Sequence, residues 1–210
     1  MRGDGDGWSN SPGGVRHWGK YGAAGLLLRA PLPRGGSAVL LQHRAPWSHQ
    51  GGTWAIPGGA RDSHESAEHA AVREAWEEAG ITADALRVRA ERLTMTAPSG
   101  WTYTTVLADA EFPLPTVANK ESSELVWVAE DEVDDLPLHP GFAAAWVELR
   151  AVPLRLRFAA EPVADLPRTV ELADRGFFWL HAQTDGPGDE VTIGPEPSDD
   201  LAEALTALLT

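Results

Sequence analysis

Three glutamates, Glu74, Glu77 and Glu78, are the residues of this sequence whose type and spacing most clearly suit chemistry. Their i, i+3 and i+4 spacing places the carboxylates on one face of a helix, because successive helical residues are rotated by about 100°. Like charges at this spacing destabilise an isolated helix, so the cluster requires either surrounding water or bound cations. Taken alone, the three residues would fit a solvated acidic helix face. The residues around them decide between the two interpretations.

The glutamates must be carried by a helix, which the sequence predicts over residues 66–79. Ser66 is suited to cap its N-terminus, and Gly80 follows its last residue, where glycine commonly ends a helix. We expect the face opposite the glutamates to pack against a sheet. The residues of that face are Val72, Ala75, Trp76 and Ala79.

Strands are predicted on both sides of this helix. Residues 21–29 and 38–44 are apolar runs separated by a turn rich in proline and glycine, which indicates a hairpin. A short strand at 53–56 lies within a glycine-rich loop. The elements predicted after the helix are strands at 87–96, 101–110 and 125–129, an acidic helical turn at 130–135 and a helix at 141–150. This order predicts a mixed α/β fold.

Composition and charge exclude several classes of protein. The 210 residues include no cysteine, which excludes a disulfide scaffold, a thiolate metal site and a cysteine nucleophile. With 31 acidic against 17 basic residues, the formal net charge is −14, so stable binding of nucleic acid is not expected. No apolar run approaches the ~20 residues that cross a membrane, and the start lacks the apolar core of a signal peptide. We therefore expect a cytoplasmic protein without a membrane partner.

Three regions differ in composition. Residues 1–19 are rich in glycine, aspartate and serine and are predicted to form a flexible N-terminal arm, followed by one domain over residues 20–150. Residues 151–210 form a C-terminal extension whose role the sequence does not indicate, and which we expect to be a packing extension or tail. It contains a strand-like segment at 177–181 and an amphipathic ending that Ser198 would cap as a helix.

The sequence around the glutamates contains a longer pattern. Gly59 is followed after five residues by Glu65, after seven more by Arg73-Glu74, and the segment closes on Glu77-Glu78-Ala79-Gly80-Ile81. This stretch resembles the Nudix box, and every glycine, glutamate and arginine position of that motif is filled. Ala75 stands where a larger aliphatic residue is usual, which changes packing beneath the helix. The resemblance covers roughly residues 20–150 and implies the Nudix α/β/α sandwich with a mixed sheet.

The resemblance also implies roles for the box residues. Glu74, Glu77 and Glu78 match metal-binding carboxylates, with Mg²⁺ as the expected cation and Mn²⁺ as a substitute, and Glu74 or Glu77 is the first candidate for the general base. Glu65 and Arg73 match paired helper residues that anchor the loop to the helix. Relatives often add a carboxylate from a later loop, where Glu121 and Glu124 are candidates and we favour Glu121.

Residues outside the helix are expected to bind substrate. By matching to the family, Arg44 is a candidate for binding phosphate, while Trp54 fits either the sheet core or a base-stacking surface. His139 could hydrogen-bond a base or could simply begin a helix. Gly58 and Gly59 allow the loop to turn tightly onto the helix.

The activity that the resemblance implies is metal-assisted attack of water on a nucleoside di- or triphosphate. The flanking segments are similar to a MutT-like branch usually assigned as 8-oxo-dGTP diphosphatase, although Ala55 and Ile56 differ from the base pocket of well-studied MutT enzymes. An ADP-ribose or nucleotide-sugar pyrophosphatase is an alternative, and Pro98 lies close to a position where such enzymes carry proline. A non-catalytic ligand sensor would usually lose box glutamates, and all are present. The oligomeric state stays open.

Overall fold

The computed structural model describes residues 3–33, 35–158, 168–172, 176–184 and 192–194. Its helices are α1 (Ala67–Ala79) and α2 (Pro140–Leu149), with 3-10 turns η1 (Pro12–Gly14), η2 (Ala83–Ala85) and η3 (Glu130–Asp135). The strands before α1 are β1 (Trp8–Asn10), β2 (Arg16–Trp18), β3 (Ala23–Pro31), β4 (Ser37–Arg44), β5 (Trp54–Ala55) and β6 (Gly58–Ala60). Those after α1 are β7 (Arg87–Thr96), β8 (Thr102–Asp109), β9 (Ser122–Ala129), β10 (Ala151–Phe158), β11 (Thr169–Leu172), β12 (Gly176–Thr184) and β13 (Thr192–Gly194). Within these ranges no helix combines the length and the apolar character that a bilayer span requires.

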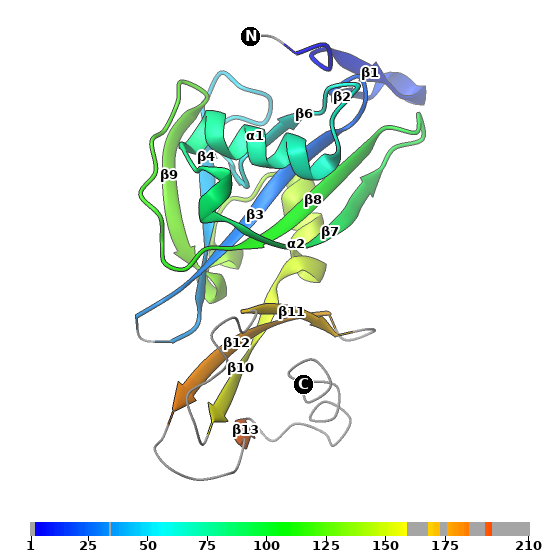
Figure 1. Cartoon of the computed structure of the whole chain (residues 1–210). Helices are drawn as coiled ribbons and strands as arrows, with labels where there is room; N and C mark the ends of the chain where they lie inside the picture. The colour runs from blue at the N-terminus through cyan, green and yellow to red at the C-terminus, as the bar shows by residue number, and fades with distance from the viewer. Residues whose placement is uncertain (1–2, 34, 159–167, 173–175, 185–191, 195–210) are drawn as a thin grey trace.

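The central sheet is mixed. Its strands follow the order β5-β4-β3-β8-β7, with β6 added to β3 and β9 added to β4. The pair β3–β8 is parallel, whereas β3–β4, β4–β9 and β7–β8 are antiparallel. β4 therefore has β3 and β5 along one side and β9 along the other. Towards its C-terminal end β4 pairs with β5 and no longer with β3, so β3 and β4 separate at the end of the sheet where the loops leading to β6 and α1 lie (Figure 1).

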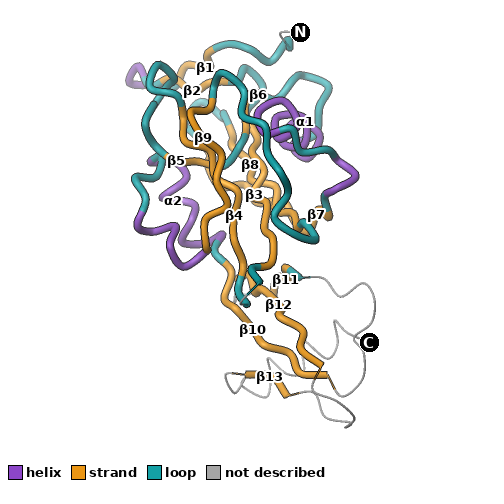
Figure 2. Tube along the Cα trace, turned by 90° about the vertical axis from the view of Figure 1, so that its left-hand side faces the viewer, coloured by secondary structure: helices purple, strands orange, loops and turns teal. Residues whose placement is uncertain are grey.

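One helix covers each face of this sheet (Figure 2). Alternate residues of a strand point to opposite faces, so Leu26 and Leu28 pack with the alanines of α1 while Leu27 packs on the other side. There it meets Phe142 and Trp146 of α2. The α/β/α sandwich expected from the sequence is confirmed.

The helix α1 has the predicted ends but not the predicted face. Ser66 Oγ accepts a hydrogen bond from the His69 backbone N at 3.1 Å, and Gly80 ends the helix with φ of 72°. The prediction that Trp76 packs against the sheet is wrong, because its side chain is 58% exposed. The buried stripe consists of Ala67, Ala70, Ala71, Ala75, Ala79 and Glu78. Trp76 lies about 100° beyond Ala75, and this rotation carries it past the edge of the stripe to the solvent side.

The N-terminal segment differs from the expected flexible arm. Within residues 3–19, β1 and β2 form an antiparallel hairpin in which Trp8 is paired with Trp18 (Figure 1). Ser11 is buried, and its hydroxyl donates a hydrogen bond to Ser99 Oγ in the β7–β8 turn at 2.8 Å. The content of glycine, aspartate and serine suggested a mobile segment. The contacts that hold the hairpin are long-range, and such contacts leave no local pattern in the sequence.

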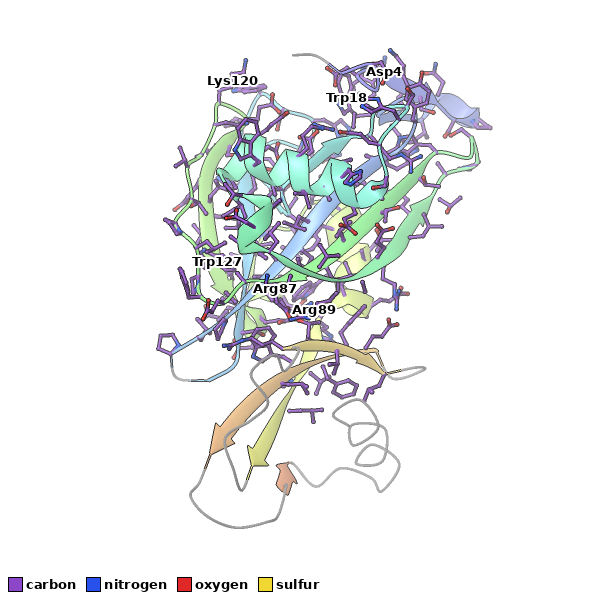
Figure 3. All side chains as sticks on the ribbon, viewed as in Figure 1. Asp4, Trp18, Arg87, Arg89, Lys120 and Trp127 are labelled. Atoms are coloured by element: carbon purple, nitrogen blue, oxygen red, sulfur yellow. The ribbon has the colours of Figure 1, made fainter. Side chains whose placement is uncertain are left out.

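A second sheet follows α2 directly, in the order β11-β12-β10-β13, with β10 parallel to β12. The strand expected at 177–181 lies within β12. The buried carboxylate of Asp109 accepts hydrogen bonds from the backbone N and the hydroxyl of Thr169 and pairs with Arg89 at 2.7 Å. These contacts join the extension to the central sheet, and Figure 3 shows Arg89 near β11. The helix expected after Ser198 lies outside the described residues.

Candidate active site

Two glutamates of α1 lie against the β5–β6 turn. Glu78 is 5% exposed, and its Oε2 accepts a hydrogen bond from the backbone N of Gly58 at 2.8 Å. A Cβ at Gly59 would come within 2.6 Å of the Glu74 carboxylate carbon. At Gly58 a Cβ would come within 2.6 Å of the Ala24 carbonyl oxygen in β3, so glycine is required there, whereas at Gly59 a side chain would displace the Glu74 carboxylate.

Burial makes these two carboxylates hard to ionise in the protein alone. Loss of solvation raises the pKa of Glu74 to about 7, despite the opposing effect of Arg73. Loss of solvation, together with the nearby charge of Glu74, raises the pKa of Glu78 to about 8. A cation between the carboxylates would offset both effects. Clustered carboxylate oxygens are also the ligands that Mg²⁺ prefers, so this set of donors fits the cation expected from the sequence.

Arg73 connects α1 to the loop before it. Its Nε donates to Glu65 Oε1 at 2.7 Å, its Nη2 to the Ala60 carbonyl at 2.9 Å, and its Nη1 to Glu74 Oε1 at 2.8 Å. The Arg73 hydrogen bond holds the pKa of Glu65 below its usual value. These bonds orient the carboxylate of Glu74, which corresponds to the anchoring arrangement expected for Arg73 and Glu65.

The third box glutamate is the exposed one. Glu77 keeps 45% of its side chain accessible, and its Oε2 lies 3.6 Å from Arg73 Nη1. Asn119 links the end of α1 to the loop before β9, because its Nδ2 donates to the Glu77 carbonyl at 3.2 Å. Its Oδ1 accepts from the backbone N of Glu121 at 2.8 Å. Glu121 is thereby held beside the carboxylate cluster.

Glu121 and Glu124 occupy different surroundings. The charge of Glu121 contributes to the raised pKa of both Glu74 and Glu78, so its carboxylate is close to the cluster. Glu124 is exposed and lines a groove with Trp54 on the other side of β9. Of the two candidates, Glu121 is the one that lies near Glu74 and Glu78.

A second group of side chains lies at the end of β4 and the start of α2. Arg44 Nε donates to the His49 carbonyl at 3.1 Å. His139 is the N-cap of α2, and its Nδ1 accepts from the backbone N of Gly141 at 3.1 Å. Burial, with the positive charges of Arg44 and His49, lowers the pKa of His139 to about 4. The neutral ring therefore carries its proton on Nε2, which remains a possible donor.

Trp54 was considered either as part of the sheet core or as a base-stacking surface, and its position has features of both. Its ring stacks on His43 with centroids 4.7 Å apart and planes at 30°, and it packs partly against the core beneath α2. It also lines the groove with Glu124. Its ring is therefore part of the sheet core and part of the surface.

Tyr103 is a site residue that the sequence analysis missed. A Cβ at Gly58 would come within 2.9 Å of its hydroxyl, so two glycines, Gly25 and Gly58, leave room for the phenol. Burial and the charge of Glu78 raise the pKa of Tyr103, while Arg44 opposes the rise. The hydroxyl therefore lies between the acidic and basic groups of the site. Its neighbours are distant in sequence, so no local pattern could have revealed it.

Gln42 is a second site residue that the sequence analysis missed. Its amide hydrogen-bonds the Ser122 hydroxyl at 2.7 Å and lowers the pKa of Glu78 through a hydrogen bond. It lies on β4 and is 1% exposed. Its signal in the sequence was a polar residue near the end of an otherwise apolar strand.

Comparison with known proteins gives three kinds of match. The family model described as NUDIX domain matches residues 22–165. A Mycobacterium tuberculosis protein named "Putative 8-oxo-dGTP diphosphatase 3" is 55% identical over 215 residues, covering 100% of this chain and 95% of that protein. A Nudix hydrolase structure from M. smegmatis, RenU, is 65% identical, with a TM-score of 0.66 over 68% of this chain and 91% of that one. A Caenorhabditis elegans Ap4A hydrolase complex, 23% identical, covers 60% of this chain and 92% of its own with a TM-score of 0.50, and shows the fold alone.

Proposed function

The chain belongs to the Nudix hydrolase family and acts on phosphoric anhydrides, and from this premise we propose that it is a Mg²⁺-dependent diphosphatase of nucleoside triphosphates. The observation that carries the proposal is a pair of carboxylates, the buried Glu78 and the largely buried Glu74, packed against Gly58 and Gly59 at the start of β6. Placing two ionised acids side by side away from water is unfavourable unless a cation or a proton neutralises them, and a cation is the partner that remains available at alkaline pH. A full-length relative at 55% identity supports the same chemistry.

In this proposal, Glu74, Glu77, Glu78 and Glu121 hold the cation. A cation held by these carboxylates would neutralise phosphate charge and lower the pKa of an attacking water. Arg73 and Glu65 keep the Glu74 carboxylate oriented by the bonds described above. Glu77 is exposed and able to accept a proton from an attacking water, which makes it the first candidate for the general base.

The basic group of the site is proposed to bind the rest of the substrate. Arg44 lies at the end of β4, where its positive charge attracts phosphate. The Nε2 proton of neutral His139 is suited to donate to a carbonyl oxygen on a base. An 8-oxopurine carries such an additional carbonyl, which agrees with the name of the M. tuberculosis relative.

We propose 8-oxo-dGTP as substrate, with 8-oxo-dGMP and diphosphate as products, and removal of oxidised nucleotides in the cytoplasm as the role. A panel containing 8-oxo-dGTP, 8-oxo-GTP, the matching diphosphates, unmodified nucleoside triphosphates and ADP-ribose tests this with Mg²⁺ or Mn²⁺. Chromatography of the products identifies the bond that is cleaved. The expected result is a preference for 8-oxo-dGTP with release of diphosphate.

Each other outcome of the panel has a defined meaning. A preference for ADP-ribose would replace the substrate while retaining the site. Absence of turnover for every compound, despite binding of nucleotide, would identify a ligand sensor and contradict the proposed catalysis. The matched control is Glu77→Gln, which retains size and removes the exposed charge.

A further inference from the structure

The N-terminal hairpin is joined to the loop that leads into α1. The Asp4 carboxylate accepts hydrogen bonds from the backbone N of Ser63 at 2.9 Å and from its hydroxyl at 2.6 Å. The backbone N of Gly5 donates to Asp62 Oδ1 at 2.7 Å. The backbone N of Asp62 in turn donates to Glu65 Oε2 at 3.0 Å, within the ion pair that orients the metal-site helix. The hairpin is therefore attached to the site through a single loop.

A second attachment holds strand β2 of the hairpin against the β7–β8 turn. Trp101 Nε1 donates to the carbonyl of Trp18 at 3.1 Å. The ring of His17 stacks on Trp101 with centroids 4.6 Å apart and planes at 19°. Figure 3 shows Asp4 and Trp18 at the same end of the molecule, above α1. The segment before β1 is bonded to the loop before α1 and β2 is bonded to the β7–β8 turn, so the hairpin is held in position at two places.

From this position Trp8 reaches the basic side of the site. Its ring lies 6.1 Å from that of His49, and the His49 ring lies 6.4 Å from that of His139. The three rings form a row from the hairpin to the start of α2. Because Arg44 donates to the His49 carbonyl, the row runs beside the guanidinium that we assign to phosphate.

The exposed surface of Trp8 suits a flat, uncharged group. The side chain is 42% exposed. The guanidinium of Arg16 lies over one face of the ring, 5.0 Å from its centre, so a base would stack on the face that Arg16 leaves uncovered. Indole offers no charge for phosphate, but its face stacks on any nucleobase. In the proposed function, the phosphates would be held by a cation at the carboxylates and by Arg44. The part of a nucleotide that lies farther out is the base.

We propose that Trp8 is a specificity-determining residue that contacts the nucleobase of the substrate, and that the hairpin forms a wall of the nucleotide site. The inference rests on the proposed function, because it needs a nucleotide held between α1 and Arg44. It adds a contact from a segment that precedes the matched NUDIX domain at residues 22–165.

The test compares binding with and without a base. The probes are tripolyphosphate and the α,β-methylene analogue of the triphosphate that the wild-type protein prefers, each titrated by calorimetry with Mg²⁺. We expect Trp8→Ala to weaken binding of the analogue about tenfold, as loss of one base–aromatic contact does. Binding of tripolyphosphate should remain within about twofold of the wild-type value, and Trp8→Phe should restore most of the lost affinity.

Trp18→Ala is the matched control, because Trp18 belongs to the same hairpin and packs edge-on against Trp8, with ring centroids 5.2 Å apart. Its anchoring contact uses the backbone carbonyl, which the substitution retains. Equal weakening by Trp18→Ala, equal weakening for tripolyphosphate, or unchanged binding by Trp8→Ala would each overturn the proposed contact. Failure of the wild-type protein to bind any nucleotide would instead refute the proposed function, and the inference with it.

Discussion

Glu78→Gln is expected to make the metal-free protein more stable at alkaline pH while abolishing its metal site. Glutamine has nearly the same size, and its side-chain oxygen can still accept the hydrogen bond from Gly58. It cannot ionise, so it avoids the cost of a buried charge. If the ionised Glu78 carboxylate stabilised the fold, the substitution Glu78→Gln would instead lower the free energy of unfolding.

The magnitude follows from the pKa of Glu78, which burial raises from 4.5 to about 8. Because the folded-state pKa is the higher one, stability is greatest when the group is protonated and falls as pH rises from about 4.5 through 8. The difference between 4.5 and about 8, at about 1.36 kcal/mol for each pH unit, corresponds to a loss of roughly 5 kcal/mol in the free energy of unfolding by pH 9. We therefore expect Glu78→Gln to exceed the wild-type free energy of unfolding by about 3–5 kcal/mol at pH 9 and by about 1 kcal/mol at pH 5.

The assay is urea unfolding in EDTA at pH 5, 7 and 9, followed by circular dichroism. Glu77→Gln is the control, since its exposed side chain should leave the difference from wild type small at every pH. Addition of Mg²⁺ should raise the stability of the wild-type protein, most strongly at pH 9, and raise that of Glu78→Gln much less. A lower stability of Glu78→Gln than of wild type at pH 9 in EDTA would refute the reasoning.

Three further predictions concern other parts of the molecule. Glu77→Gln should reduce kcat by about 100-fold or more with an unchanged circular dichroism spectrum, and near-normal turnover would reject an essential role. Gly59→Ala should weaken binding of Mg²⁺, measured by calorimetry, because its Cβ would displace the Glu74 carboxylate; unchanged affinity would contradict the tight turn. Asp109→Ala should lower the free energy of unfolding by about 3 kcal/mol, because it leaves Thr169 and Arg89 without their partner, while KM stays the same. A changed KM would show that the extension communicates with the site.

The sequence predicted the parts of the structure that depend on neighbouring residues. Ser66, Gly80 and the glutamate spacing define α1, because caps and helical periodicity act within a few residues. The buried face of α1 was assigned wrongly for Trp76, since the sequence did not show that Glu78 would lie inside the stripe. Tyr103 could not be assigned to the site, because its position depends on glycines in strands distant along the chain.

The acidic and basic sides of the site are held by different kinds of structural element. This difference explains why the sequence indicates the hydrolytic chemistry more clearly than it indicates the base that is bound. Three of the four proposed cation ligands are carried by α1, where Arg73 and Gly58 hold Glu74 and Glu78, so most of this chemistry is encoded within one continuous segment. The basic side is assembled from the end of β4, the start of α2 and the proposed Trp8 contact, which are separate in sequence. Loops and termini tolerate substitution better than a packed helix. Changes there can alter the base that is accepted while the carboxylate cluster continues to act on the same anhydride.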